Sequence, residues 1–129
     1  MSDVILDASA VLALLHEEPG AELVQKYLPK ARISSVNLAE VITRLNLVGL
    51  PTGQILEALN LLSLDVVPFD EEQALQAGIL ALETKGLGLS LGDRACLALG
   101  IVTGCAVLTA DKAWLEVDLG VEVVLARSL

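Results

Sequence analysis

Four carboxylates stand where apolar segments end or where helices are expected to begin. Asp7 closes the apolar run 4–6, and Asp111 follows the run 107–110. Glu40 and Asp93 lie in the opening turns of two segments with helical spacing. Acids that converge without basic partners repel one another unless they hold a divalent cation. The residue types and their positions therefore predict a metal-dependent site.

The chain alternates strand-like and helix-like segments, which must position these acids. Apolar and β-branched runs predict strands at 4–6, 32–34, 65–69, 105–108 and 121–125. Helical spacing predicts helices at 8–15, 21–28, 35–48, 52–62, 70–85, 90–102 and 112–115. Ser35 and Thr52 are expected to cap two of these helices, and Asp70 and Gln73 have the spacing of a capping box. Pro68 places the third strand near a sheet edge.

Strands separated by helices pair in parallel through right-handed crossovers. We therefore expect a single α/β domain over residues 1–129, with three layers (α/β/α) and a central parallel five-stranded sheet. Ligands of such sheets bind beyond the carboxyl ends of the strands, near the point where strand order reverses. Asp7 and Asp111 would lie at that edge directly. Glu40 and Asp93 would reach it because each opens a helix that starts there.

Each acid also has a purely structural interpretation. Asp7 and Asp111 can cap the helices that follow them, and Asp93 can complete a capping box. Glu40 can form a surface ion pair with Arg44 at i,i+4. Four caps that converge on one edge by chance are the less economical explanation, so a shared site is favoured.

Composition and charge limit the partners. Hydrophobic residues make up 54% of the chain, and this surplus predicts a subunit interface in a homodimer. The net charge of -9 argues against nucleic-acid binding through a basic face, although two divalent cations would cancel four of these charges. An acidic surface also suits a basic protein partner. Near the acids, the basic residues are Arg44, Arg94 and Lys112, which are candidates for substrate binding.

Cysteine use and hydropathy indicate a cytoplasmic protein. Cys96 and Cys105 form no CxxC motif and have no nearby His, so we expect reduced thiols rather than a disulfide or a zinc site. Asp7 interrupts the N-terminal apolar run, which argues against a secretory signal. The uncharged stretch 95–110 is short for a membrane span.

Four segments resemble the acidic motifs of PIN-domain proteins, and most closely those of VapC-type toxin ribonucleases. They are Asp-Ala-Ser-Ala at 7–10, Asn-Leu-Ala-Glu-Val at 37–41, Leu-Ser-Leu-Gly-Asp-Arg-Ala at 89–95 and Leu-Thr-Ala-Asp at 108–111. The resemblance runs essentially end to end. It implies a PIN-like fold and a Mg²⁺- or Mn²⁺-dependent endoribonuclease. It also implies a homodimer whose cognate antitoxin presents a basic inhibitory segment to the acidic groove.

The resemblance assigns all four acids to the catalytic metal site. Asp7 and Asp93 become the principal ligands, Glu40 a ligand or the group that orients the attacking water, and Asp111 the support of a second ion. Hydrolysis of RNA would leave a 5′-phosphate and a 3′-hydroxyl. Whether one metal or two act is left open. Few basic residues lie near these motifs, so the chain has few side chains that could bind RNA phosphates.

Two hydroxyl side chains flank the acids at the strand ends. Ser9 follows Asp7 by two residues, and Thr109 precedes Asp111 by two. Hydroxyls in such positions either orient a carboxylate or only satisfy the backbone. We expect both to orient carboxylates.

Two alternative functions remain open at this stage. A receiver-type signalling domain is also a small α/β sheet, and Asp70 follows the third predicted strand where a phosphorylated Asp would lie. That class normally has two acids together after the first strand, whereas Asp7 stands alone. The other alternative is a PIN-like interaction module with weak or no catalysis.

Overall fold

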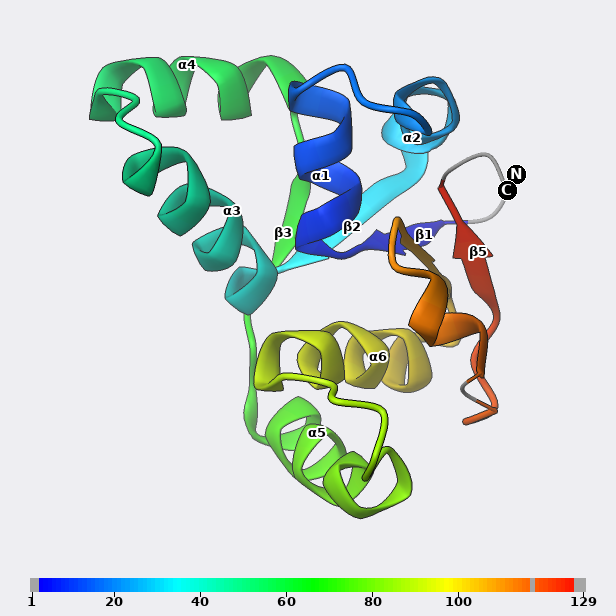
Figure 1. Ribbon diagram of the computed structural model, residues 1–129. Coiled ribbons are helices and arrows are strands. Elements are labelled where there is room, and N and C mark those ends of the chain that lie inside the picture. Colours follow the sequence, from blue (N-terminus) through cyan, green and yellow to red (C-terminus); the bar gives the residue numbers. More distant parts are fainter. Residues whose placement is uncertain (1–2, 117, 127–129) are drawn as a thin grey trace.

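The computed structural model describes residues 3–116 and 118–126, which fold around one parallel sheet (Figure 1). The strands are β1 Val4–Leu6, β2 Ala31–Ser34, β3 Asp65–Val67, β4 Ala106–Thr109 and β5 Val123–Leu125. Their order is β3-β2-β1-β4-β5, and every pairing is parallel. The predicted five-stranded parallel α/β fold is confirmed.

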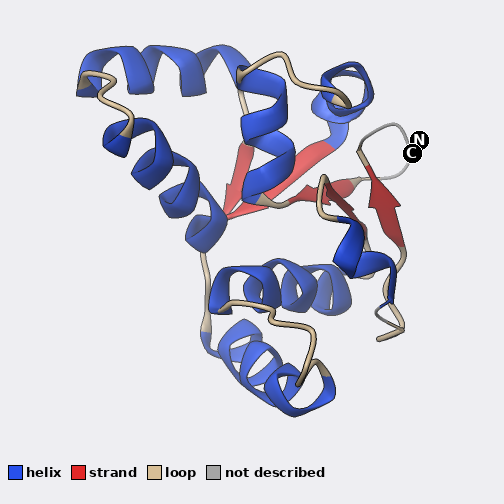
Figure 2. Ribbon diagram, viewed as in Figure 1, coloured by secondary structure: helices blue, strands red, loops and turns tan. Residues whose placement is uncertain are grey.

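Helices lie on both sides of this sheet, as Figure 2 shows. They are α1 Ala8–Leu15, α2 Ala21–Tyr27, α3 Ser35–Leu47, α4 Thr52–Leu62, α5 Glu71–Glu83 and α6 Leu91–Thr103. Two short 3₁₀ helices, η1 Leu28–Lys30 and η2 Lys112–Glu116, complete the described elements. In the described part of the chain, no helix has the length and apolar character needed to cross a membrane.

Side-chain alternation along the strands divides the core into two layers. Val4 and Leu6 of β1 pack with buried residues of α1, α2, α3 and α4, whereas Ile5 packs with buried residues of α5, α6 and η2. This follows from the two-residue repeat of a strand, which sends successive side chains to opposite faces. In Figure 1, α5 and α6 accordingly lie below the sheet and α1 to α4 above it.

The strand order reverses between β1 and β4, in the centre of the sheet. Leu6 is in register with Ile33 of β2 on one side and with Leu108 of β4 on the other. The carboxyl ends of the three strands therefore coincide, and ligands of open α/β sheets bind at such a point. The strand order also excludes the receiver alternative, because that class has the order 2-1-3-4-5.

The two outer strands, β3 and β5, are shorter than the sequence predicts, and the inner strand β4 is displaced by one residue. β3 lies at the sheet edge, as Pro68 indicates, but it ends at Val67 because proline has no N–H for a ladder bond. β4 begins one residue after Cys105, and β5 begins at Val123 rather than at residue 121.

Both cysteines are free thiols, as predicted. Cys96 is fully buried in α6, where burial raises the pKa of its thiol well above the ordinary value. Cys105 is partly buried. The thiol of Cys96 is therefore a core group.

The N-cap of α3 is Ser34, not the expected Ser35. The hydroxyl of Ser34 accepts a hydrogen bond from the backbone N of Val36 at 3.2 Å. Ser35 Oγ instead accepts from the backbone N of Phe69 at 3.0 Å, which ties the start of α3 to the segment after β3. The local sequence pattern cannot tell which of two adjacent serines is the N-cap. The hydrogen bond to Phe69 engages Ser35 and leaves Ser34 as the cap.

Two other capping predictions also differ from the structure. Pro51 occupies the N-cap of α4, and Thr52 makes no capping bond. Asp70 does cap α5 by accepting from the backbone N of Gln73 at 3.0 Å. The reciprocal bond of a capping box is replaced, because Gln73 Nε2 donates to the carbonyl of Pro68 at 2.9 Å.

We predict that Ser34→Ala lowers the free energy of unfolding by about 1 kcal/mol, the usual loss for an N-cap serine. Thr52→Ala is the matched control, because it removes a hydroxyl at a helix start that makes no capping bond. Its effect should stay within about 0.5 kcal/mol. Urea unfolding of both variants measures the difference, and equal losses would contradict the assignment of the cap.

Candidate functional site

The four predicted acids line one cavity of about 600 Å³ at the carboxyl edge of the sheet. Asp7 follows β1 and Asp111 follows β4, whereas Glu40 comes from the first turns of α3 and Asp93 from the first turn of α6. Four different elements thus bring these carboxylates to a common space. Ser9 also lines the cavity.

Asp7 is the most buried of these acids, with 4% of its surface exposed. It accepts hydrogen bonds from Thr109 Oγ1 at 2.6 Å, from Ser9 Oγ at 2.8 and 2.9 Å, and from the backbone N of Ala10 at 2.8 Å. Burial raises the pKa of Asp7 from 3.8 to about 6, and these hydrogen bonds oppose the rise. The negative charge of Asp93 adds a smaller increase.

The two flanking hydroxyls connect the ends of β1 and β4. Ser9 Oγ accepts from the backbone N of Ala110 at 2.9 Å, and Thr109 Oγ1 accepts from the backbone N of Asp111 at 3.0 Å. Both hydroxyls also donate to the carboxylate of Asp7. They therefore hold that carboxylate directly, whereas Thr109 contacts only the backbone of Asp111.

Asp93 and Asp111 have the structural roles that their positions allow. Asp93 Oδ2 accepts from the backbone N of Ser90 at 2.9 Å, and the backbone N of Asp93 donates to Ser90 Oγ at 3.2 Å, which completes a capping box. Asp111 Oδ1 accepts from the backbone N of Ala113 at 3.0 Å. One oxygen of each carboxylate is left without a hydrogen bond to a described residue. Local capping and a place in the cavity are therefore compatible.

Glu40 is held by an amide rather than by a base. Asn37 Nδ2 donates to Glu40 Oε1 at 2.8 Å, and the expected alternative of a Glu40–Arg44 ion pair is wrong, since Arg44 pairs with no acid in the described part of the chain. The residues that the sequence predicts for the site do not include Asn37, Ser90 or Glu18, of which Ser90 and Glu18 line the cavity. Asn37 is detectable only as a polar residue on the buried face of α3.

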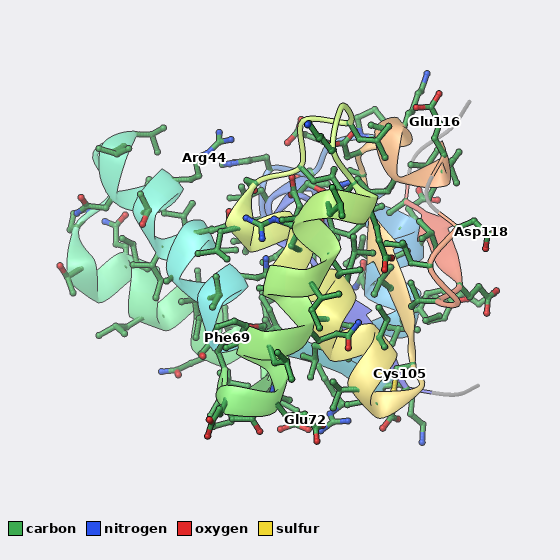
Figure 3. The ribbon with its side chains drawn as sticks, turned by 90° about the horizontal axis from the view of Figure 1, so that it is seen from below. Arg44, Phe69, Glu72, Cys105, Glu116 and Asp118 are labelled. Atoms are coloured by element: carbon green, nitrogen blue, oxygen red, sulfur yellow. The ribbon has the colours of Figure 1, made fainter. Side chains whose placement is uncertain are left out.

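Of the three predicted substrate-binding bases, Arg44 lines the cavity. Its exposed side chain extends outward from α3 and is labelled in Figure 3. Arg94 Nη1 instead donates to the carbonyl of Ala77 at 2.9 Å, which directs this guanidinium to α5. Lys112 is exposed at the start of η2 and is not part of the cavity wall.

The donor chemistry of the cavity fits a hard divalent cation, although no ligand cage is preformed. Within residues 3–116 and 118–126, no three His, Cys, Asp or Glu side chains stand close enough together to hold one ion. The four acids nevertheless offer only carboxylate oxygens, which Mg²⁺ and Mn²⁺ prefer.

A model of the PIN domain family matches residues 4–119. The chain belongs to the PIN-domain family. A search of curated proteins found no match.

Solved structures share the fold of this PIN domain at low sequence identity. A toxin–antitoxin complex from Klebsiella pneumoniae has a TM-score of 0.78 at 19% identity, covering 98% of this chain and 100% of that chain. DNA-bound VapBC from Salmonella typhimurium has a TM-score of 0.76 at 21% identity, with coverages of 96% and 98%. VapBC2 from Rickettsia felis, bound to a promoter DNA fragment, has a TM-score of 0.77 at 16% identity, with coverages of 94% and 96%.

We predict that Asp7→Asn stabilises the metal-free protein by an amount that grows with pH. Because burial raises the pKa of Asp7 from 3.8 to about 6, the folded protein must hold an ionised, desolvated carboxylate above that pH. The unfolding free energy of the wild type should therefore fall, relative to the variant, as the pH rises from about 4 through about 6. A pKa difference of this size corresponds to about 3 kcal/mol.

Urea unfolding in the presence of a chelator, between about pH 4 and pH 7, measures this difference. Asp70→Asn is the control, because Asp70 also caps a helix but is exposed and lies outside the cavity. A stability difference between Asp7→Asn and the wild type that does not change with pH would contradict the prediction.

Proposed function

We propose that this PIN domain is a Mg²⁺- or Mn²⁺-dependent endoribonuclease and the toxin of a type II toxin–antitoxin pair. The observation that carries the proposal is the convergence of Asp7, Glu40, Asp93 and Asp111 on one cavity. Glu18 adds a fifth carboxylate to its wall, and Arg44 is the only base among the described residues that line it. Structural similarity to VapBC complexes supports the proposal at the level of the fold. The resemblance of the four acidic motifs to those of VapC toxins points to the same activity.

Each acid has a role that its surroundings support. Asp7 and Asp93 would hold the cation, since hydrogen bonds fix both carboxylates against strand and helix ends. Glu40 would hold the cation or orient the attacking water, and Asp111 would support a second ion. A bound divalent cation supplies charge neutralisation and lowers the pKa of water. In-line attack of water on the phosphorus, with the 3′-oxygen as the leaving group, would leave a 5′-phosphate and a 3′-hydroxyl.

The proposed partners are RNA, a cognate antitoxin with a basic segment, and a second copy of the chain in a cytoplasmic homodimer. Two groups of exposed apolar side chains offer surface for protein contacts. One lies on α3 and its C-cap and on α4 (Leu47, Val48, Leu56, Leu61), and the other lies on α5 (Leu75, Ile79, Leu82). The acidic cavity suits the basic segment through charge complementarity.

A second candidate function is a PIN-like interaction module with weak or no catalysis. The absence of a preformed group of three ligands among the described residues favours it. Such a module would bind its protein partner without measurable affinity for Mn²⁺. Metal binding by the isolated protein therefore separates the two candidates.

We predict that Asp93→Asn weakens Mn²⁺ binding at least about tenfold, because loss of a proposed ligand should cost no less than the loss of a residue that only orients a ligand. Asp70→Asn is the matched control, because Asp70 is likewise a helix-capping acid but does not line the cavity. Its affinity for Mn²⁺ should equal that of the wild type. Calorimetric titration of antitoxin-free protein measures all three.

Equal Mn²⁺ affinities of the wild type and Asp93→Asn would contradict the proposed site. No binding by the wild type, even at millimolar Mn²⁺, would favour the interaction module.

We also predict that Arg44→Ala raises the KM for RNA cleavage about tenfold with little change in kcat, because it removes a phosphate contact made equally in ground and transition states. Lys112→Ala is the control, since this exposed base lies outside the cavity wall. Cleavage of a fluorogenic RNA measures KM and kcat for both variants. Equal effects of the two substitutions would contradict a role of Arg44 in RNA binding. In the same reaction, analysis of the product ends should find 5′-phosphates.

A further inference from the structure

Asn37 is a buried amide at the contact between α3 and α6. It precedes Glu40 by one helical turn and is 1% exposed. Its Nδ2 donates to Glu40 Oε1 at 2.8 Å and to the carbonyl of Gly92 in α6 at 3.0 Å. The other buried residues of α3, Val41 and Leu45, are apolar. A polar residue at this position therefore interrupts a hydrophobic face.

The two acceptors fix the orientation of the Asn37 amide. An ionised Glu40 and a backbone carbonyl only accept hydrogen bonds, so the NH₂ group must face both of them. Asn37 Oδ1 is then buried without a partner among the described residues. An unsatisfied buried acceptor costs stability, and a hydrophobic side chain would avoid that cost. Packing alone therefore does not explain why this position holds an asparagine.

Gly92 provides a second, independent observation about the same carboxylate. It is buried within the first turn of α6, although glycine is among the least favourable helix residues. A Cβ placed on Gly92 would meet the carboxylate of Glu40 more closely than side-chain carbons approach such atoms in proteins. Because Gly92 has no side chain, the Glu40 carboxylate can occupy this space. Gly92 directly precedes Asp93 in the sequence.

We infer that Asn37 is a positioning residue, which together with Gly92 holds the carboxylate of Glu40 against the first turn of α6 in the acidic cavity. The inference rests on the proposed metal-dependent function. An amide holds the carboxylate without a compensating positive charge, so the negative charge of Glu40 stays available to a cation. The bond to the Gly92 carbonyl ties this position to the helix that carries Asp93.

Mn²⁺ titration by calorimetry of the full chain tests this role. Asn37→Ala should weaken Mn²⁺ binding about tenfold or more, the usual loss when a residue that orients a metal ligand is removed. Asn46→Ala is the matched control, because Asn46 is an exposed asparagine of the same helix. Its affinity should equal that of the wild type. A lower urea midpoint for Asn37→Ala with unchanged Mn²⁺ affinity would overturn the inference.

A double-mutant cycle tests whether Asn37 acts through Glu40. In a Glu40→Gln background, Asn37→Ala should cause little further loss of Mn²⁺ affinity, because the group that it positions has already lost its charge. A loss as large as that in the wild-type background would mean that Asn37 acts by another route, and the inference would fail.

Gly92→Ala keeps the test decisive if Asn37→Ala does not fold. The new methyl group meets the end of a flexible side chain, so the protein should accommodate it by moving the Glu40 carboxylate. Mn²⁺ affinity should then fall although Asn37 is intact. Unchanged affinity in a folded Gly92→Ala variant would overturn the inference.

Failure of the proposed function gives a different result. A wild type that binds no Mn²⁺ would overturn the metal-dependent nuclease, and the holding of Glu40 would then be judged by NMR. The side-chain amide protons of Asn37 should exchange slowly with solvent in the wild type and faster in Glu40→Ala. Fast exchange in the wild type would overturn the positioning role itself.

Discussion

At the end of the central strand, the carboxylate of Asp7 is almost excluded from water and accepts hydrogen bonds from Ser9, Thr109 and a backbone N–H. These neutral donors hold the carboxylate without cancelling its charge, and its pKa remains raised by burial. The same hydroxyls bond the backbone after β4. The hydrogen bonds that join the end of β4 to the start of α1 thus centre on the Asp7 carboxylate, although burying its charge lowers the stability of the fold.

Helix N-termini allow this acidic cavity to exist with so few bases. Asp7 accepts a backbone N–H at the start of α1, Asp93 does so at the start of α6, and Asp111 accepts one at the start of η2. The unpaired N–H groups of a first turn carry partial positive charge, which lessens the mutual repulsion of carboxylates. The same arrangement therefore caps the helices and would serve the proposed cation.

Sequence patterns predict the sheet and the meeting of Asp7 with Asp111, because residues that close parallel strands share an edge. They do not predict the bond between Asn37 and Gly92, which are 55 residues apart and meet only when α3 packs on α6. They also assign Arg94 to substrate, since its neighbours in sequence are site residues and its actual acceptor is a carbonyl of α5. Local spacing thus identifies groups at strand ends, whereas helix packing decides where the remaining polar side chains point.

The pairing of β1 with β4 has a consequence during synthesis of the chain. Leu6 is in register with Leu108, so β1 obtains one of its two neighbours only after the residues of β4, about 100 positions later, have been synthesised. A nascent polypeptide that still lacks β4 holds Asp7 without the hydroxyl of Thr109 and without Asp111. The proposed metal site would therefore stay incomplete until β4 has paired with β1.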